Sequence, residues 1–246
     1  MPVAPLAPPP ARPRSLRRVA AAVALILVGV AGVGGGGAAL ALEMTRHATK
    51  AEQAAALQAE MASRWRRMSA GKIFPAAVGY TASDGGAIMT ARRVGIAPQA
   101  SCAVAVDPTL ARVLSRNGCV TVLRATYLGG SGSLAVTTGV AVMKSTAAAS
   151  KAVASSGSAQ GAGVRTFGLP GTVADLYGNR QRRAFNEIES IGPYIFLYAA
   201  GYSDGRISGS ATDDPDLVDL GSGVVIGLQN ALTFQGRACS MKDIKC

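Results

Sequence analysis

Residues 119–143, CVTVLRATYLGGSGSLAVTTGVAVM, decide the fold. Two runs rich in β-branched residues, 119–128 and 134–143, flank a turn of glycine and serine at 129–133. Apolar and β-branched side chains recur at every second position of the second run, which is the spacing of a strand with two distinct faces. The segment therefore predicts a β-hairpin and, with it, an antiparallel sheet.

Helix signals flank this hairpin on both sides. Asp107-Pro108 provides a cap and a first-turn proline, and Asn117-Gly118 ends that helix. Ser145 caps an alanine-rich helix, and Asp214-Pro215 begins a last helix that takes in the glycine-spaced segment 221–227. Further strands are expected at 73–80, 94–96, 185–191 and 194–200, while 103–106 is either a short strand or the approach to a helix.

This order of elements predicts an α+β domain, an antiparallel sheet with the helices packed on one face. A duplication of two ββα halves, joined by the small-residue linker 155–163, is left open. Along 194–200 the aromatic residues alternate with Ile195 and Leu197, so both faces of this strand are apolar. Such a strand is central in a sheet. An aromatic-lined ligand groove is the alternative reading of the same residues.

The second informative feature is the uncharged apolar stretch 19–42, which follows Arg12, Arg14, Arg17 and Arg18. About 20 such residues span a bilayer as a helix, and flanking arginines stay on the cytoplasmic side. We therefore expect a single-pass protein of the cell membrane with an extracytoplasmic C-terminal domain. Its expected parts are a disordered cytoplasmic tail at 1–18, a transmembrane helix at 19–42, a helical stalk at 43–69 and the α+β domain at 70–246.

The same stretch also fits a cleaved signal peptide. Ala39-Leu40-Ala41 has the small-x-small pattern of a cleavage site. Cleavage near Ala41 would release a secreted domain. A retained anchor is the preferred interpretation, because the apolar run is longer than the 7–15 residues usual for a signal core.

The four cysteines, Cys102, Cys119, Cys239 and Cys246, all follow the apolar stretch. Disulfides persist in oxidising compartments. Among the three pairings that four cysteines allow, the sequence-local one, Cys102–Cys119 with Cys239–Cys246, is the prediction. Four free buried thiols are the alternative. Zinc is not expected, since the chain has no CxxC pair and its single histidine, His47, lies beside the apolar stretch.

The charge of the chain points to anionic partners. Removing the four tail arginines from the net charge of +11 leaves +7 on the exported part. Membrane lipid, an envelope protein and an anionic wall polymer are the expected partners, and nucleic acid is not. Arg64, Arg66 and Arg67, with Trp65 between them, form a membrane-proximal basic patch or simply a solvated helix end.

No catalytic site, cofactor site or metal site is expected. Gly201-Tyr202-Ser203-Asp204-Gly205 matches the GxSxG pattern of hydrolases, but no histidine follows Ser203, so a turn is the better interpretation. Glu187 and Glu189 share one strand face, and the aspartates at 213–219 fit a helix N-terminus. We expect a binding or accessory domain, not an enzyme, with an extracytoplasmic hydrolase as the alternative.

The segment 117–127, NGCVTVLRATY, and the later TGVAV at 138–142 resemble uncharacterised single-pass membrane proteins of high-GC actinobacteria with a small exported α+β domain. The N-terminal stretch and the expected stalk agree with that resemblance. It implies a cell-envelope location. It implies no particular activity and assigns no site residue.

Overall fold

The computed structural model describes residues 48–83, 85–159, 161–185, 188–207 and 214–233. The expected tail 1–18, the expected transmembrane helix 19–42 and the expected disulfide between Cys239 and Cys246 lie outside these residues. Among the described residues, no helix combines the length and the apolar character that crossing a bilayer requires.

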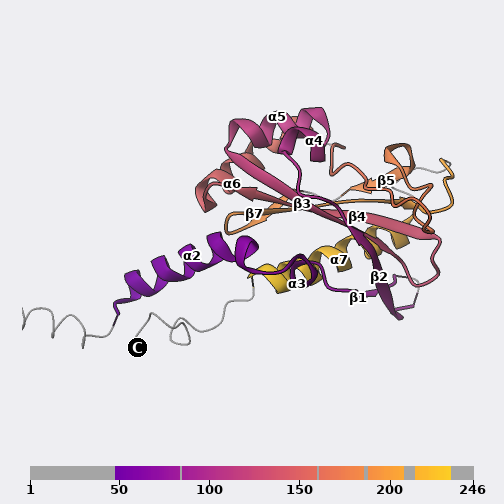
Figure 1. Ribbon diagram of the computed structural model, residues 1–246, viewed down its shortest axis with the longest axis horizontal. Coiled ribbons are helices and arrows are strands. Elements are labelled where there is room, and N and C mark those ends of the chain that lie inside the picture. Colours follow the sequence, from indigo (N-terminus) through magenta and orange to yellow (C-terminus); the bar gives the residue numbers. More distant parts are fainter. Residues whose placement is uncertain (1–47, 84, 160, 186–187, 208–213, 234–246) are drawn as a thin grey trace, which may run out of the picture. The chain divides into compact units, whose positions relative to one another are not determined.

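The described chain is a mixed α+β domain built on an antiparallel sheet (Figure 1). Its strands are β1 (Ala77–Thr81), β2 (Ile88–Ile96), β3 (Cys119–Leu128), β4 (Leu134–Met143), β5 (Arg182–Phe185), β6 (Glu189–Ile191) and β7 (Tyr194–Tyr202). Its helices are α2 (Lys50–Arg67), α3 (Ala70–Ile73), α4 (Cys102–Ala105), α5 (Pro108–Arg116), α6 (Thr146–Ala154) and α7 (Pro215–Thr233).

The β3–β4 hairpin is the centre of the sheet, as the opening stretch of sequence predicted. The strand order is β1-β2-β3-β4-β7-β5, and β6 pairs with the other half of β7. Opposite Val140, Leu123 lies on β3 and Phe196 lies on β7. Because β7 is flanked by β4 on one side and by β5 and β6 on the other, it is a central strand, in agreement with its two apolar faces.

Helices cover both faces of the sheet, so the expectation of helices on one face is wrong (Figure 1). On β7, Tyr194 and Phe196 pack with α7, α2 and α3, whereas Ile195 and Leu197 pack with α4, α5 and α6. The physical reason is the composition of the central strands. A strand that is apolar on both faces leaves one face in water unless a second layer covers it.

Several local expectations also differ from the structure. Residues 103–106 belong largely to the short helix α4, and Ile73 ends α3 instead of starting a strand. The two parts on either side of the linker 155–163 are not ββα copies. The first contributes four strands to the sheet, and among the described residues the second contributes β7 and two short strands that pair only with it.

Glycines let α7 lie close against the sheet. A Cβ atom on Gly221 would lie 2.3 Å from Cε2 of Tyr198, and one on Gly223 would lie 2.3 Å from Cβ of Tyr80. The spacing of these glycines therefore serves helix packing. At the start of the helix, Oδ1 of Asp214 accepts a hydrogen bond from the Asp216 N–H at 3.1 Å.

Candidate functional site

The last two turns of α2 are built into the domain. Met61 is 6% exposed and packs in the same apolar cluster as α7. The Tyr194 hydroxyl donates to the Met61 carbonyl and accepts from the Trp65 N–H at 3.3 Å, and burial raises the pKa of Tyr194. Arg64 donates to the Leu232 carbonyl at 3.0 Å. These contacts fix where Trp65 and its neighbours lie.

The three arginines of the basic patch have different surroundings. Glu60 pairs with Arg64 at 2.8 Å and with Arg67 at 3.1 Å, so a single carboxylate lies between two of the three arginines and offsets one of their charges. Arg66 has no acidic partner within the described part of the chain. Its guanidinium carbon lies 4.8 Å from the centre of the Trp65 ring, within the range of a cation–π contact.

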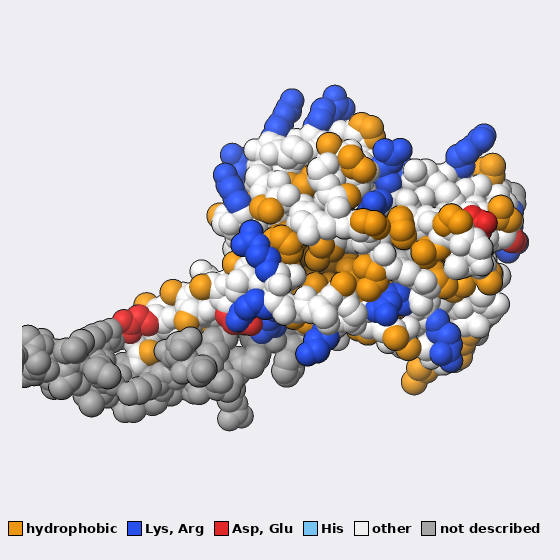
Figure 2. All heavy atoms as spheres, viewed as in Figure 1, with side chains coloured by type: hydrophobic (Ala, Val, Ile, Leu, Met, Phe, Trp, Pro, Cys, Tyr) orange, Lys and Arg blue, Asp and Glu red, His pale blue; other side chains and the backbone are white. Residues whose placement is uncertain are grey.

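Beside Arg66 the structure has a groove of about 430 Å³, which we call the Trp65 groove. It lies between α2 and α3 on one side and the end of β2 and the middle of β3 on the other. Its volume is in the range of small-molecule sites. Figure 2 shows hydrophobic side chains gathered in a hollow at the middle of the visible face, with Lys and Arg side chains around it. The apolar side chains that line the groove are Trp65, Met68, Ile73, Phe74, Ile96 and Leu123.

The polar groups of the groove are few and lie at its border. Arg66 and Gln99 line it, and both residues are exposed. A second positive charge lies nearby, because the Arg93 guanidinium donates to the carbonyl of Phe74, itself a lining residue. None of the described residues that line the groove is acidic. The groove therefore combines an apolar interior with a positively charged edge.

A second hollow, of about 400 Å³, lies between α7 and strands β5 to β7. Phe185, Tyr198 and Val225 give it apolar walls, and Glu189 and Gln229 are among its polar residues. Tyr198 belongs to the aromatic strand for which a ligand groove was the alternative interpretation of the sequence. Burial raises the pKa of Tyr198. The described residues of its lining include no basic side chain, so they do not match the anionic partners that the charge of the chain predicts.

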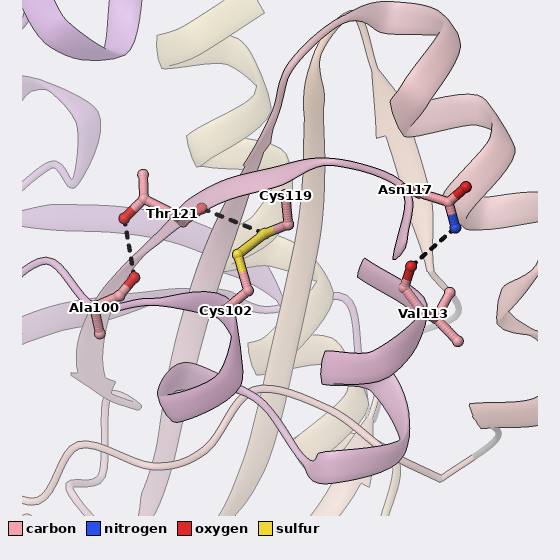
Figure 3. The surroundings of a disulfide bond; sticks show 6 residues. All are labelled: Ala100, Cys102, Val113, Asn117, Cys119 and Thr121. Carbon is pink, nitrogen blue, oxygen red and sulfur yellow. Dashed lines mark hydrogen bonds between the residues drawn. A yellow bond between two sulfur atoms is a disulfide. The ribbon is translucent and has the colours of Figure 1, made fainter. Parts of the chain in front are cut away.

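The disulfide lies on the face of the sheet that is covered by α4, α5 and α6, opposite to the face covered by α7. Cys102 at the start of α4 and Cys119 at the start of β3 are joined, the first of the two bonds predicted (Figure 3). Next to it the Thr121 hydroxyl donates to the Ala100 carbonyl at 2.9 Å, and the Asn117 side chain donates to the Val113 carbonyl at 2.9 Å (Figure 3). The bond ties the α4–α5 layer to the sheet.

Asp107 does not cap α5 with its side chain, contrary to the expectation from Asp107-Pro108. Its carboxylate instead forms a two-pronged ion pair with Arg182 at 2.7 and 2.9 Å and accepts the Gly163 N–H at 2.9 Å. Burial by itself would raise the pKa of Asp107, but the hydrogen bonds from Arg182 and Gly163 and the charges of Arg182 and Arg165 outweigh it and lower that pKa. The site is structural, linking α5 to β5 and to the linker.

The residues considered for catalysis are not brought together. Ser203 lies in a turn after β7, is 3% exposed and donates its hydroxyl to the Gly132 carbonyl at 2.6 Å. Glu189 is exposed at the start of β6, and Glu187 lies outside the described residues. Within the described residues no cluster of His, Cys, Asp and Glu could hold a metal ion.

Comparison of the chain with protein-family models, with curated proteins and with solved structures gave no match. The function must therefore be argued from the groove and from the chemistry of the chain.

Proposed function

We propose that this chain is a membrane-anchored, extracytoplasmic binding domain of the cell envelope, and that the Trp65 groove is its binding site. The observation that carries the proposal is the groove itself, an apolar hollow of about 430 Å³ with unneutralised positive charge at its edge. Pockets of this size with few polar groups are typical of ligand sites.

The proposed location is supported by three features of the chain. The apolar stretch 19–42 follows four arginines, the remaining chain is basic, and Cys102 and Cys119 form a disulfide. Disulfides are rare in the reducing cytosol. In this proposal residues 19–42 bind membrane lipid, the helix α2 continues as the stalk, and the domain binds an envelope component without a cofactor.

The location is tested by cell fractionation with a C-terminal epitope tag. The full chain should be found in the membrane fraction with its N-terminal residues intact, and external protease should remove the tag from whole cells. Recovery of a soluble chain that begins just after Ala41 would instead show a secreted domain, and a protease-protected tag would contradict the proposed orientation.

Binding is tested with a matched pair of alanine variants. Ala70 is exposed and lines the groove, whereas Ala62 is exposed on α2 and does not line it. Full-length wild-type, Ala70→Phe and Ala62→Phe chains are used to capture components of detergent-extracted envelopes at physiological salt. We expect a component that wild type and Ala62→Phe retain and that Ala70→Phe loses. Equal capture by all three chains would contradict the groove as the site.

The proposal assigns no catalytic activity to the domain. If a hydrolytic activity is detected in the purified chain, the Ser203→Ala variant should leave it unchanged, because the Ser203 hydroxyl is buried and hydrogen-bonded to Gly132. Loss of that activity, with the fold retained by circular dichroism, would favour the hydrolase alternative.

A further inference from the structure

Building on the proposed binding function, we infer the chemical class of the ligand: an anionic amphiphile taken from the envelope membrane. Its hydrocarbon chain occupies the Trp65 groove and its acidic headgroup lies at Arg66.

The interior of the groove suits a hydrocarbon chain. Apolar side chains from α2, α3, β2 and β3 line it, and Phe74 and Ile73 at its base are only 1% and 2% exposed. Removing apolar ligand surface from water is favourable, in proportion to the area removed. The long side chain of Met68 can adapt to ligands of somewhat different shape.

The edge of the groove selects a negative charge. Glu60 pairs with both Arg64 and Arg67, whereas Arg66 is the member of the patch without an acidic partner in the described chain. Stacking on Trp65 holds the Arg66 guanidinium at the groove. Arg93 adds positive charge next to Phe74. A headgroup at this edge meets the Arg66 guanidinium, and guanidinium binds carboxylate and phosphate oxygens with well-matched geometry.

A peptide fits the same groove less well than an amphiphile. Backbone N–H and C=O groups must be hydrogen-bonded when they are buried, and peptides often satisfy them by pairing with a free strand edge. Here β2 is already paired with β1 and β3, and β3 with β2 and β4. Among the described lining residues, polar side-chain atoms are confined to Arg66, Gln99 and the indole N–H of Trp65, and of these only Gln99 offers an acceptor for a peptide N–H. A ligand with one polar end and one apolar chain matches this distribution of polar and apolar groups in the groove.

The chain carries its own reporter for a test, since Trp65 is its single tryptophan and lines the groove. Bromine atoms quench tryptophan fluorescence on contact. Full-length protein in neutral maltoside micelles is titrated with dibrominated stearate, which is anionic, and with dibrominated stearamide, which has the same chain and no charge. Both probes enter micelles, so the difference between them measures what the protein recognises.

We expect the brominated stearate to quench the wild-type protein in a saturable way. In Arg66→Gln the apparent affinity for the stearate should be about fivefold weaker than in wild type, the size of effect typical of a partly exposed ion pair. Arg112→Gln, which removes an exposed arginine from α5 on the other face, should behave as wild type. Ala70→Phe should abolish the saturable component and Ala62→Phe should keep it, with circular dichroism confirming that each variant is folded.

Three results would overturn the inference. Equal quenching by stearate and stearamide would show that charge is not recognised, and quenching that persists in Ala70→Phe would place the probe outside the groove. Retention of a polyglycerol-phosphate polymer, unaffected by Ala70→Phe and without stearate binding, would indicate a surface for wall polymers. If the groove captures an envelope component but stearate causes no quenching, the inferred ligand class is refuted and the proposed binding function stands. If stearate quenches a chain that is found outside the membrane fraction, the ligand class stands and the proposed membrane-anchored function is refuted.

Discussion

Removing the Cys102–Cys119 disulfide should destabilise the whole domain and not only the helices next to it. The bond closes a loop between residues 17 positions apart, and this loop contains α4 and α5. In the chain-entropy model a loop of this length stabilises the folded state by about 3 kcal/mol, through the restriction of the unfolded chain. For a domain of this size that loss corresponds to a fall in Tm of about 6–12 °C.

The perturbation is the pair of substitutions Cys102→Ala and Cys119→Ala. It is made in a chain that already carries Cys239→Ala and Cys246→Ala, so that no other thiol can form a wrong pair. The chain with only the latter two substitutions is the reference. Urea unfolding of both proteins gives the difference in the free energy of unfolding, and a reducing agent should destabilise the reference by the same amount while leaving the four-alanine chain unchanged.

Two spectroscopic signals tell whether the effect is transmitted through the sheet. Trp65 packs against the apolar cluster on the face of α7, whereas Cys102 and Cys119 lie in the cluster on the opposite face. If both clusters unfold together, tryptophan fluorescence and far-ultraviolet circular dichroism change at the same urea concentration in both proteins. A destabilisation below about 1 kcal/mol would refute the loop-closure estimate, and separate transitions would refute cooperativity between the two faces.

Three further substitutions test particular contacts. Gly223→Ala should lower the free energy of unfolding in urea by about 1–2 kcal/mol. The added Cβ would lie only 3.1 Å from Cα of Tyr80 and would push α7 away from the sheet. The cost of this overpacking exceeds the roughly 1 kcal/mol gained in helix propensity. Asp107→Asn should lower the free energy of unfolding by about 2 kcal/mol at neutral pH. Because Arg182 lowers the pKa of Asp107 in the folded state, the stabilisation by this carboxylate is lost as the pH falls through that lowered pKa. The unfolding curves of wild type and variant should therefore converge in acid. Tyr177→Phe should cost about 1–3 kcal/mol by thermal unfolding, because it leaves a buried backbone carbonyl without its donor; an unchanged Tm would contradict the role of that hydrogen bond.

The central hairpin could be predicted because its signals are local. The β-branched residues of 119–128, the alternating side chains of 134–143 and a small-residue turn between the two runs indicate the pairing without help from the rest of the chain. The short apolar run 103–106 had no such signal, since four residues fit a strand and a helical turn equally well. There the disulfide at Cys102 and the start of α5 at Pro108 leave room for one helical turn.

The second helical layer could have been inferred from the sequence. The alternation along 194–200 already indicated two apolar faces, and that composition contradicts an arrangement with helices on one side. The ion pair of Asp107 with Arg182 could not have been foreseen in the same way. The two residues are 75 positions apart, and a cap at Asp107-Pro108 is what local rules predict.

The groove was only partly visible in the sequence. Arg64, Arg66 and Arg67 were identified as a group, and the spacing of Glu60 and Arg64, one helical turn apart, was sufficient to predict that one of these charges is neutralised. The apolar lining was not predictable, because it comes from four elements whose positions depend on the sheet. Side chains at Ile96 and Leu123 become neighbours of Trp65 only after β2, β3 and α2 have packed.

The disulfide and the groove are connected through β3, although they lie on opposite faces of the sheet. Leu123 lines the groove, while its neighbour Val122 packs in the cluster that contains Cys102. Val122 also exchanges backbone hydrogen bonds with Ala100, directly after the groove residue Gln99. The bond at Cys119 therefore holds the strand that forms one wall of the groove and the segment that forms its edge. In the proposed extracytoplasmic location, oxidising conditions form this disulfide. Because the disulfide holds one wall and the edge of the groove, the same conditions would fix the shape of the groove.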